Sequence, residues 1–131
     1  MAASSSGAVA AALGAILLLA AAPVAAATLG SAVLFSTDAQ KLDCFLSNVG
    51  RSPVAITQVS IVNGGNTILS LGADTCTPTL PPGGNCVFSA ALDARFSARG
   101  VVELRGSAKG LRGQCQLTTS SNHVVASNDL R

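Results

Sequence analysis

The chain has 131 residues, a formal net charge of +2, no tryptophan or tyrosine and four phenylalanines. This length fits one ordinary domain, and so small a net charge argues against a nucleic-acid-binding protein, which needs a strongly basic surface. All eight basic and all six acidic residues follow residue 27, so the uncharged N-terminal segment inflates the mean hydropathy of the whole chain.

Residues 1–27 are typical of a secretory signal peptide. A polar opening without Lys or Arg leads into an apolar stretch centred on residues 15–19, and then into Pro23 and small residues, in the order that export signals show. Ala25 and Ala27 form an A-x-A site, which predicts cleavage after Ala27, with the bond after Ala26 as the second choice.

The alternative is an N-terminal helix that stays attached as a membrane anchor. Residues 8–27 are mostly small and apolar, and about 20 such residues suffice to span a bilayer. Alanine and glycine gain less than leucine from transfer into lipid, and the leucine-rich centre is short. We therefore expect a cleaved signal-peptide helix and a secreted or periplasmic protein, whereas retention makes the protein membrane-anchored.

The segment after the leader favours strands, because short stretches alternate apolar and polar residues and no helical period is sustained. An opening strand is predicted at residues 28–35. In the next strand, at residues 41–47, Leu42, Cys44 and Leu46 share an inward face and Phe45 points outward.

The strand that follows, at residues 53–62, changes parity. Its apolar residues fall on two faces, and a bulge near residues 57–58 brings all four to one side; they are Val54, Ile56, Val59 and Ile61. The NGG sequence at residues 63–65 predicts a type I′ hairpin turn, because Asn and Gly tolerate positive φ. The return strand is expected at residues 67–71.

Three more strands are predicted in the second half of the chain. Their inward sets are Cys86, Phe88, Ala90 and Leu92, then Val102 and Leu104, then Leu111, Gly113, Cys115 and Leu117. Short strands separated by Gly, Pro and Asn predict an all-β antiparallel sandwich or barrel of about seven strands. We expect this domain to span residues 28–118 and a polar tail to occupy residues 119–131, with an edge strand in the tail as the alternative.

Three segments carry a recognisable pattern: NVGRSPVAITQVSI (residues 48–61), CTPTLPPGGNCVFSA (76–90) and GVVELRGS (100–107). Their N-x-G turn, P-V-x-I strand and cysteine-flanked L-x-P-G turn resemble the immunoglobulin-like ASH-type domains of bacterial exported proteins. The resemblance covers roughly residues 42–107. It implies a seven-stranded immunoglobulin-like β-sandwich in which Cys76 and Cys86 bond to each other.

Four cysteines behind an export signal indicate two disulfides formed in an oxidising compartment. With Cys76–Cys86 implied by the resemblance, the second bond joins Cys44 and Cys115, which both lie on inward faces. In the chain-entropy model, the bond that closes the shorter loop stabilises the fold by about 2 to 3 kcal/mol, and the bond that closes the longer loop stabilises it by about 4 kcal/mol.

The loop between Cys76 and Cys86 is expected to be a rigid connection. Pro81 and Pro82 restrict φ, and the glycines after them permit a reversal of the chain. The tip of this loop, from Leu80 to Asn85, is predicted to be an exposed contact surface.

No catalytic residue, metal site or cofactor is predicted. Nine residues separate Cys76 from Cys86, unlike the C-x-x-C of redox enzymes, and His123 is the only histidine, too few ligands for zinc. There is no G-x-S-x-G nucleophile motif, and the carboxylates are scattered singly rather than paired. A hydrolase needs His123 to be ordered beside a serine or a carboxylate.

Basic residues gather between positions 95 and 112: Arg95, Arg99, Arg105, Lys109 and Arg112. Strand parity predicts that Arg99, Arg105 and Arg112 share the outer face of one sheet, forming a patch for anionic glycans, lipid headgroups or an acidic partner. An ordinary solvated face that includes Glu103 is the alternative. Phe96 is the only aromatic residue between these positions, which argues against the stacking surfaces of nucleic-acid-binding proteins.

These features predict an exported, non-catalytic β-sandwich that interacts with an unidentified protein or with a component of the cell envelope. One alternative is a protein that binds a small ligand or an anionic surface through the end of the sandwich or the basic face. An apolar concave pocket is expected of a small-ligand binder. The remaining alternative is a hydrolase.

Overall fold

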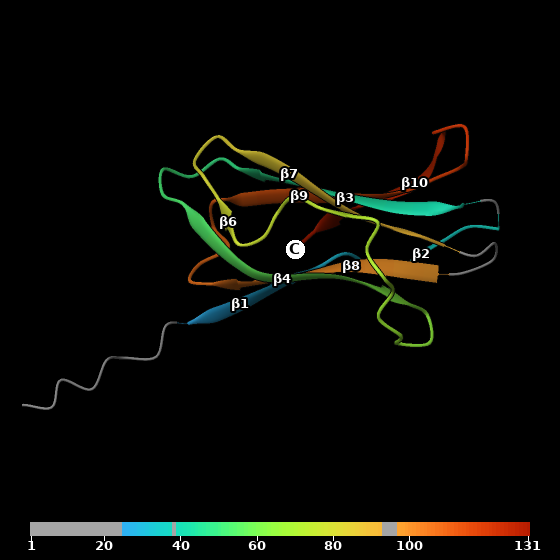
Figure 1. Ribbon diagram of the computed structural model, residues 1–131, viewed down its shortest axis with the longest axis horizontal. Helices are drawn as coiled ribbons and strands as arrows, with labels where there is room; N and C mark the ends of the chain where they lie inside the picture. Colours follow the sequence, from blue (N-terminus) through green and yellow to red (C-terminus); the bar gives the residue numbers. More distant parts are fainter. Residues whose placement is uncertain (1–24, 38, 93–96) are drawn as a thin grey trace, which may run out of the picture.

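The computed structural model describes residues 25–37, 39–92 and 97–131. The expected signal-peptide helix, in residues 1–24, lies outside the described residues, as does Arg95. The described chain forms ten strands and no helix (Figure 1). The strands are β1 (Ala26–Gly30), β2 (Leu34–Phe35), β3 (Lys41–Asn48), β4 (Val54–Asn63), β5 (Ala73–Asp74), β6 (Thr79–Leu80), β7 (Asn85–Ala91), β8 (Ser97–Arg105), β9 (Leu111–Thr118) and β10 (Val124–Leu130).

The strands form two antiparallel sheets that face each other as a sandwich (Figure 1). One sheet has the order β1-β8-β4-β6, with β2 also on β8, and the other has the order β10-β9-β3-β7-β5. The predicted fold class is confirmed. The strand number exceeds the expected seven because the opening segment is split into β1 and β2, which both pair with β8, and because β5, β6 and β10 are added while the strand expected at 67–71 does not form.

The core lies between the sheets and uses the inward faces predicted from period-two alternation. Phe88, Leu42 and Leu46 are fully buried, whereas Phe45 is exposed. Burial of each large apolar side chain contributes about 1.5 to 3 kcal/mol. The other apolar residues predicted to face inward are also buried: Val54, Ile56, Val59, Ile61, Ala90, Leu92, Val102, Leu104, Leu111 and Leu117.

The Cys44–Cys115 disulfide, predicted from the inward faces, is confirmed. The two cysteines are direct register partners on β3 and β9, with Cα atoms 4.0 Å apart. Gly100 of β8, in the opposite sheet, faces the bond, and a Cβ placed on Gly100 overlaps both sulfur atoms. A side chain is therefore excluded at position 100, where the two sheets meet.

The bulge predicted in β4 is confirmed. The register of β4 against β8 shifts between Ile56 and Gln58, which leaves Thr57 as the extra residue. The Thr57 hydroxyl donates a 3.0 Å hydrogen bond to the Glu103 carbonyl. The shift turns Val59 and Ile61 to the same buried side as Ile56.

The turn after β4 differs from the predicted type I′ hairpin. Positive φ falls on Asn66 (59°), and neither Gly64 nor Gly65 has it. Glycine is instead needed at position 64 because the backbone there lies against Ser97. The Gly64 amide donates to the Ser97 carbonyl, and a Cβ on Gly64 overlaps the Ser97 side chain. The return strand at 67–71 is reduced to a single bridge from Ile68 to β4.

The C-terminal segment 119–131, predicted as a polar tail, contains the edge strand that was the alternative. Strand β10 pairs with β9, and Leu130 is buried against the core. A bridge from Ser31 to Leu130 joins the edges of the two sheets. The sandwich therefore extends to residue 130. At its other terminus, the expected cleavage point after Ala27 lies within β1.

Candidate functional site

Asn48 closes the loop that follows β3. Its side chain is 1% exposed, and Nδ2 donates hydrogen bonds to the carbonyls of Ser52 (2.9 Å) and Leu80 (3.0 Å). Its Oδ1 accepts a 3.0 Å bond from the Gly50 amide. The N-x-G pattern is therefore a local turn in which the asparagine side chain replaces backbone partners.

Three loops meet at this asparagine at one end of the sandwich (left in Figure 1). The Asn48 amide donates to the Gly84 carbonyl at 2.9 Å, and the Gly83 amide donates to the Asn48 carbonyl at 2.8 Å. These bonds attach the loop at 81–84. The loop at 106–110 is attached by the Val49 amide, which donates to the Gly110 carbonyl at 2.8 Å.

Gly50 and Gly110 allow the loops at 49–53 and 106–110 to touch. A Cβ added to Gly110 lies 3.1 Å from the Gly50 Cα, and one added to Gly50 lies 3.3 Å from the Gly110 Cα. The two backbones are therefore in direct contact. This contact fixes the spacing between the side chains that the loops carry.

A groove of about 850 Å³ opens between the two loops, and four cationic side chains line it. Arg51 comes from the loop at 49–53, Arg105 from the end of β8, Lys109 from the loop at 106–110 and Arg112 from the start of β9. We call this site the basic groove. Among the residues that the structure describes, no carboxylate lines it.

No described carboxylate forms an ion pair with a groove cation, although Glu103 is exposed on β8 two residues before Arg105. Asp43 pairs with Lys41 at 3.2 Å, and Asp129 pairs with Arg131 at 3.8 Å. Asp74 accepts hydrogen bonds from the segment at 76–77. Within the described residues, the four groove cations form no ion pair. Unpaired cations gathered in one concave site attract anions.

Arg112 is held in place by the loop itself. Its Nη1 donates to the carbonyls of Lys109 at 3.1 Å and Leu111 at 2.7 Å. These two bonds fold the side chain back along the loop at 106–110 and fix the guanidinium beside Lys109. One wall of the basic groove is therefore ordered without a bound ligand.

The prediction that Arg99, Arg105 and Arg112 share one outer face is wrong. Strands β8 and β9 belong to different sheets, so parity along the chain does not relate their faces. The loop at 106–110 still brings Arg105 and Arg112 together, whereas Arg99 lies further along β8, opposite Val62. Sequence reasoning missed Arg51, although its place directly after the N-x-G turn was a usable signal.

For the loop between Cys76 and Cys86, the predicted disulfide is confirmed and the predicted exposed surface is partly wrong. The Cys76–Cys86 disulfide predicted from the resemblance is present. Leu80, predicted as an exposed contact, is 3% exposed, because it lies in β6 opposite Val54 and packs into the core. Asn85 is exposed, and its Oδ1 accepts a 2.6 Å bond from the Ser47 hydroxyl.

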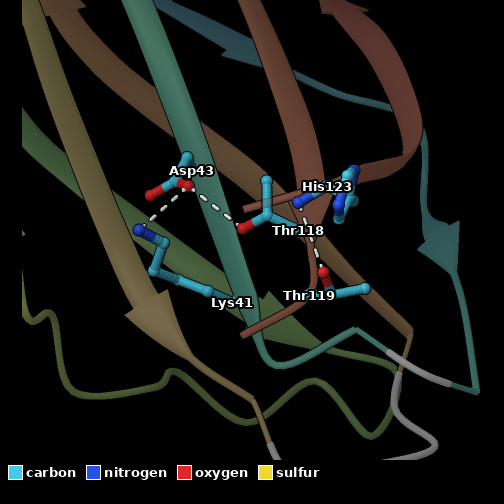
Figure 2. Close-up of polar contacts among 5 residues, drawn as sticks. All are labelled: Lys41, Asp43, Thr118, Thr119 and His123. Carbon is cyan, nitrogen blue, oxygen red and sulfur yellow. Dashed lines mark hydrogen bonds and ion pairs between the residues drawn. The ribbon is translucent and has the colours of Figure 1, made fainter. Parts of the chain in front are cut away.

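His123 lies in the turn between β9 and β10, at the opposite end from the basic groove. Figure 2 shows its amide donating to the Thr119 hydroxyl, at 3.2 Å. The imidazole makes no hydrogen bond or ion pair within the described part of the chain. The nearly buried Asp43 accepts from Thr118 and pairs with Lys41 in the same view. This cluster ties β3 to β9.

No group of three His, Cys, Asp or Glu residues suited to a metal ion occurs among residues 25–37, 39–92 and 97–131. The same part of the chain contains no helix long and apolar enough to cross a membrane. No protein-family model, curated protein or solved structure matches the chain.

Replacing Asn48 with alanine is expected to lower the free energy of unfolding by about 2 to 4 kcal/mol, because it removes three hydrogen bonds and leaves buried partners unsatisfied. Urea unfolding measured without reductant checks this value. Asn85→Ala is the control. It removes one exposed hydrogen bond at the same end and should change the midpoint little. Equal midpoints for the two variants would contradict the role of Asn48 as the junction of the three loops.

Proposed function

We propose that the protein is an exported, non-catalytic β-sandwich that binds an anionic component of the cell envelope, or an acidic partner, through the basic groove. The observation that carries this proposal is one concave site lined by four cations that, among the described residues, have no ion pair and no carboxylate beside them in the lining. The two disulfides support the oxidising extracellular or periplasmic compartment that the proposal requires.

The chemistry of the groove favours phosphate, sulfate or carboxylate groups. Three of the four cations are arginines, whose planar guanidinium groups bind such anions through paired hydrogen bonds. A small apolar ligand is less well supported, because four cationic side chains line the groove, whereas the described apolar side chains that line it are Val49, Pro53 and Val54. The ordered Arg112 also lowers the entropy lost when an anion binds.

Retention of the full-length protein on a sulfated polysaccharide matrix tests the proposal. Wild-type protein should bind and elute with salt, since the attraction is electrostatic. Arg51→Glu changes the charge of the groove by two units and should weaken binding about 30-fold, at roughly 1 kcal/mol for each unit of charge near an anionic surface.

Arg99→Glu is the matched control. It changes the net charge equally, and Arg99 is exposed on β8 outside the groove. Its elution should stay close to that of the wild type. Equal losses in the two variants would mean that retention follows net charge alone. That result, or a wild-type protein that is not retained, would reject the basic groove as the binding site.

A further inference from the structure

The N-terminal segment joins the sandwich beside the basic groove. Strand β1 runs antiparallel to β8, so that Ala26 lies opposite Arg105 and Gly30 lies opposite Val101. The Gly106 amide, in the groove loop at 106–110, donates a 2.6 Å hydrogen bond to the Ala25 carbonyl. The first described residues are thus fixed to the end of the sandwich that carries the groove cations (Figure 1).

The sequence immediately before this point is suited to a bilayer. Residues 8–24 carry no charge and are mainly alanine, leucine and valine, a composition that enters membranes either as an export signal or as an anchor. An extended chain spans at most about 3.6 Å per residue. The apolar segment ends at residue 24, directly before Ala25, so the groove end is the membrane-proximal end while the segment is attached.

We propose that the basic groove docks on the anionic phospholipid headgroups of the membrane that holds the N-terminal segment. The sandwich then stands on the bilayer with Arg51, Arg105, Lys109 and Arg112 directed at the lipid phosphates. This inference rests on the proposed function, since it requires an anion-binding groove, and it specifies the anion.

A second feature of the groove favours a lipid surface over a soluble anion. Val49 lines the groove next to Arg51 and is 63% exposed. An apolar side chain beside cations is the arrangement of interfacial membrane contacts, in which the apolar group enters the headgroup region and the cations meet phosphate. Each cation near an anionic bilayer strengthens attachment about fivefold.

Hydrogen exchange of the full-length chain tests this docking. The protein is reconstituted into vesicles of phosphatidylcholine alone, or of phosphatidylcholine mixed with phosphatidylglycerol, so that the N-terminal segment is held equally in both. Amides of the loops at 49–53 and 106–110 should exchange several-fold more slowly on the anionic vesicles. The turn at 63–67, at the opposite end of β4, should exchange alike on both.

Two variants make the outcome specific. Arg51→Glu should abolish the slowing on anionic vesicles, and Arg99→Glu should keep it. Equal exchange of the groove loops on both kinds of vesicle overturns the inference, as does slowing confined to the turn at 63–67. If binding to the sulfated matrix still depends on Arg51 in that case, the groove binds a soluble anion and the proposed function stands. If the protein also does not bind the sulfated matrix, the docking inference and the proposed function are both rejected.

Discussion

Replacing Gly100 with alanine is expected to destabilise the sandwich by about 3 kcal/mol, at the upper end of the range for overpacked cores. The new methyl group overlaps both sulfur atoms of the Cys44–Cys115 bond and lies 3.4 Å from Phe88. Neither sulfur can move aside, because each is fixed to a central strand of the facing sheet. The variant should therefore unfold at a clearly lower urea concentration.

Gly30→Ala is the matched control for this experiment. Gly30 is also a strand glycine, but the nearest atom to an added Cβ is 3.9 Å away. Alanine there should be neutral or stabilise the protein slightly, because glycine in a strand loses more backbone entropy on folding. If Gly100→Ala and Gly30→Ala unfold at the same urea concentration, the disulfide does not pack against β8 as described.

Removing the Cys44–Cys115 bond by a double substitution to alanine is expected to lower stability by about 4 kcal/mol, because the bond closes a long loop of the unfolded chain. Its sequence separation is 71, against 10 for Cys76–Cys86. The equivalent change at Cys76 and Cys86 should remove about 2 to 3 kcal/mol. Urea unfolding without reductant measures both losses.

The two changes should also be coupled. In the variant that lacks the Cys44 and Cys115 sulfur atoms, the obstacle to a Cβ at position 100 is gone. Gly100→Ala should therefore cost less there than in the wild-type protein, and a double-mutant cycle measures the difference. If Gly100→Ala lowers the stability equally in both backgrounds, the added methyl group does not clash with the two sulfur atoms. A greater loss from breaking Cys76–Cys86 would contradict the ranking by loop length.

Period-two alternation was enough to predict the inward faces, because a sandwich buries one face of each strand. It also located the β4 bulge, since Ile56 and Val59 cannot both face inward without one extra residue. The pairing of Cys44 with Cys115 followed from the same faces. These features depend on local geometry, which the order of residues determines.

The features that sequence reasoning missed depend on contacts between distant segments. Leu80 lies between Pro78 and the Pro81-Pro82 pair, which indicates an exposed loop, yet two residues of pairing with β4 bury it. The basic groove joins Arg51 to Lys109 only because Gly50 and Gly110 bring their loops into contact. No sequence spacing relates these residues, and Arg99 lies outside the groove because it is six residues before Arg105 on β8.

Titration of the isotopically labelled full-length protein with a soluble sulfated oligosaccharide tests the binding role of the basic groove most directly. Amide chemical shifts report which residues the anion approaches. We expect concentration-dependent shifts at residues 48–53 and 105–112, and their loss in Arg51→Glu. Shifts centred on Arg99 or on the turn that holds His123, or no shifts at all, would contradict this assignment.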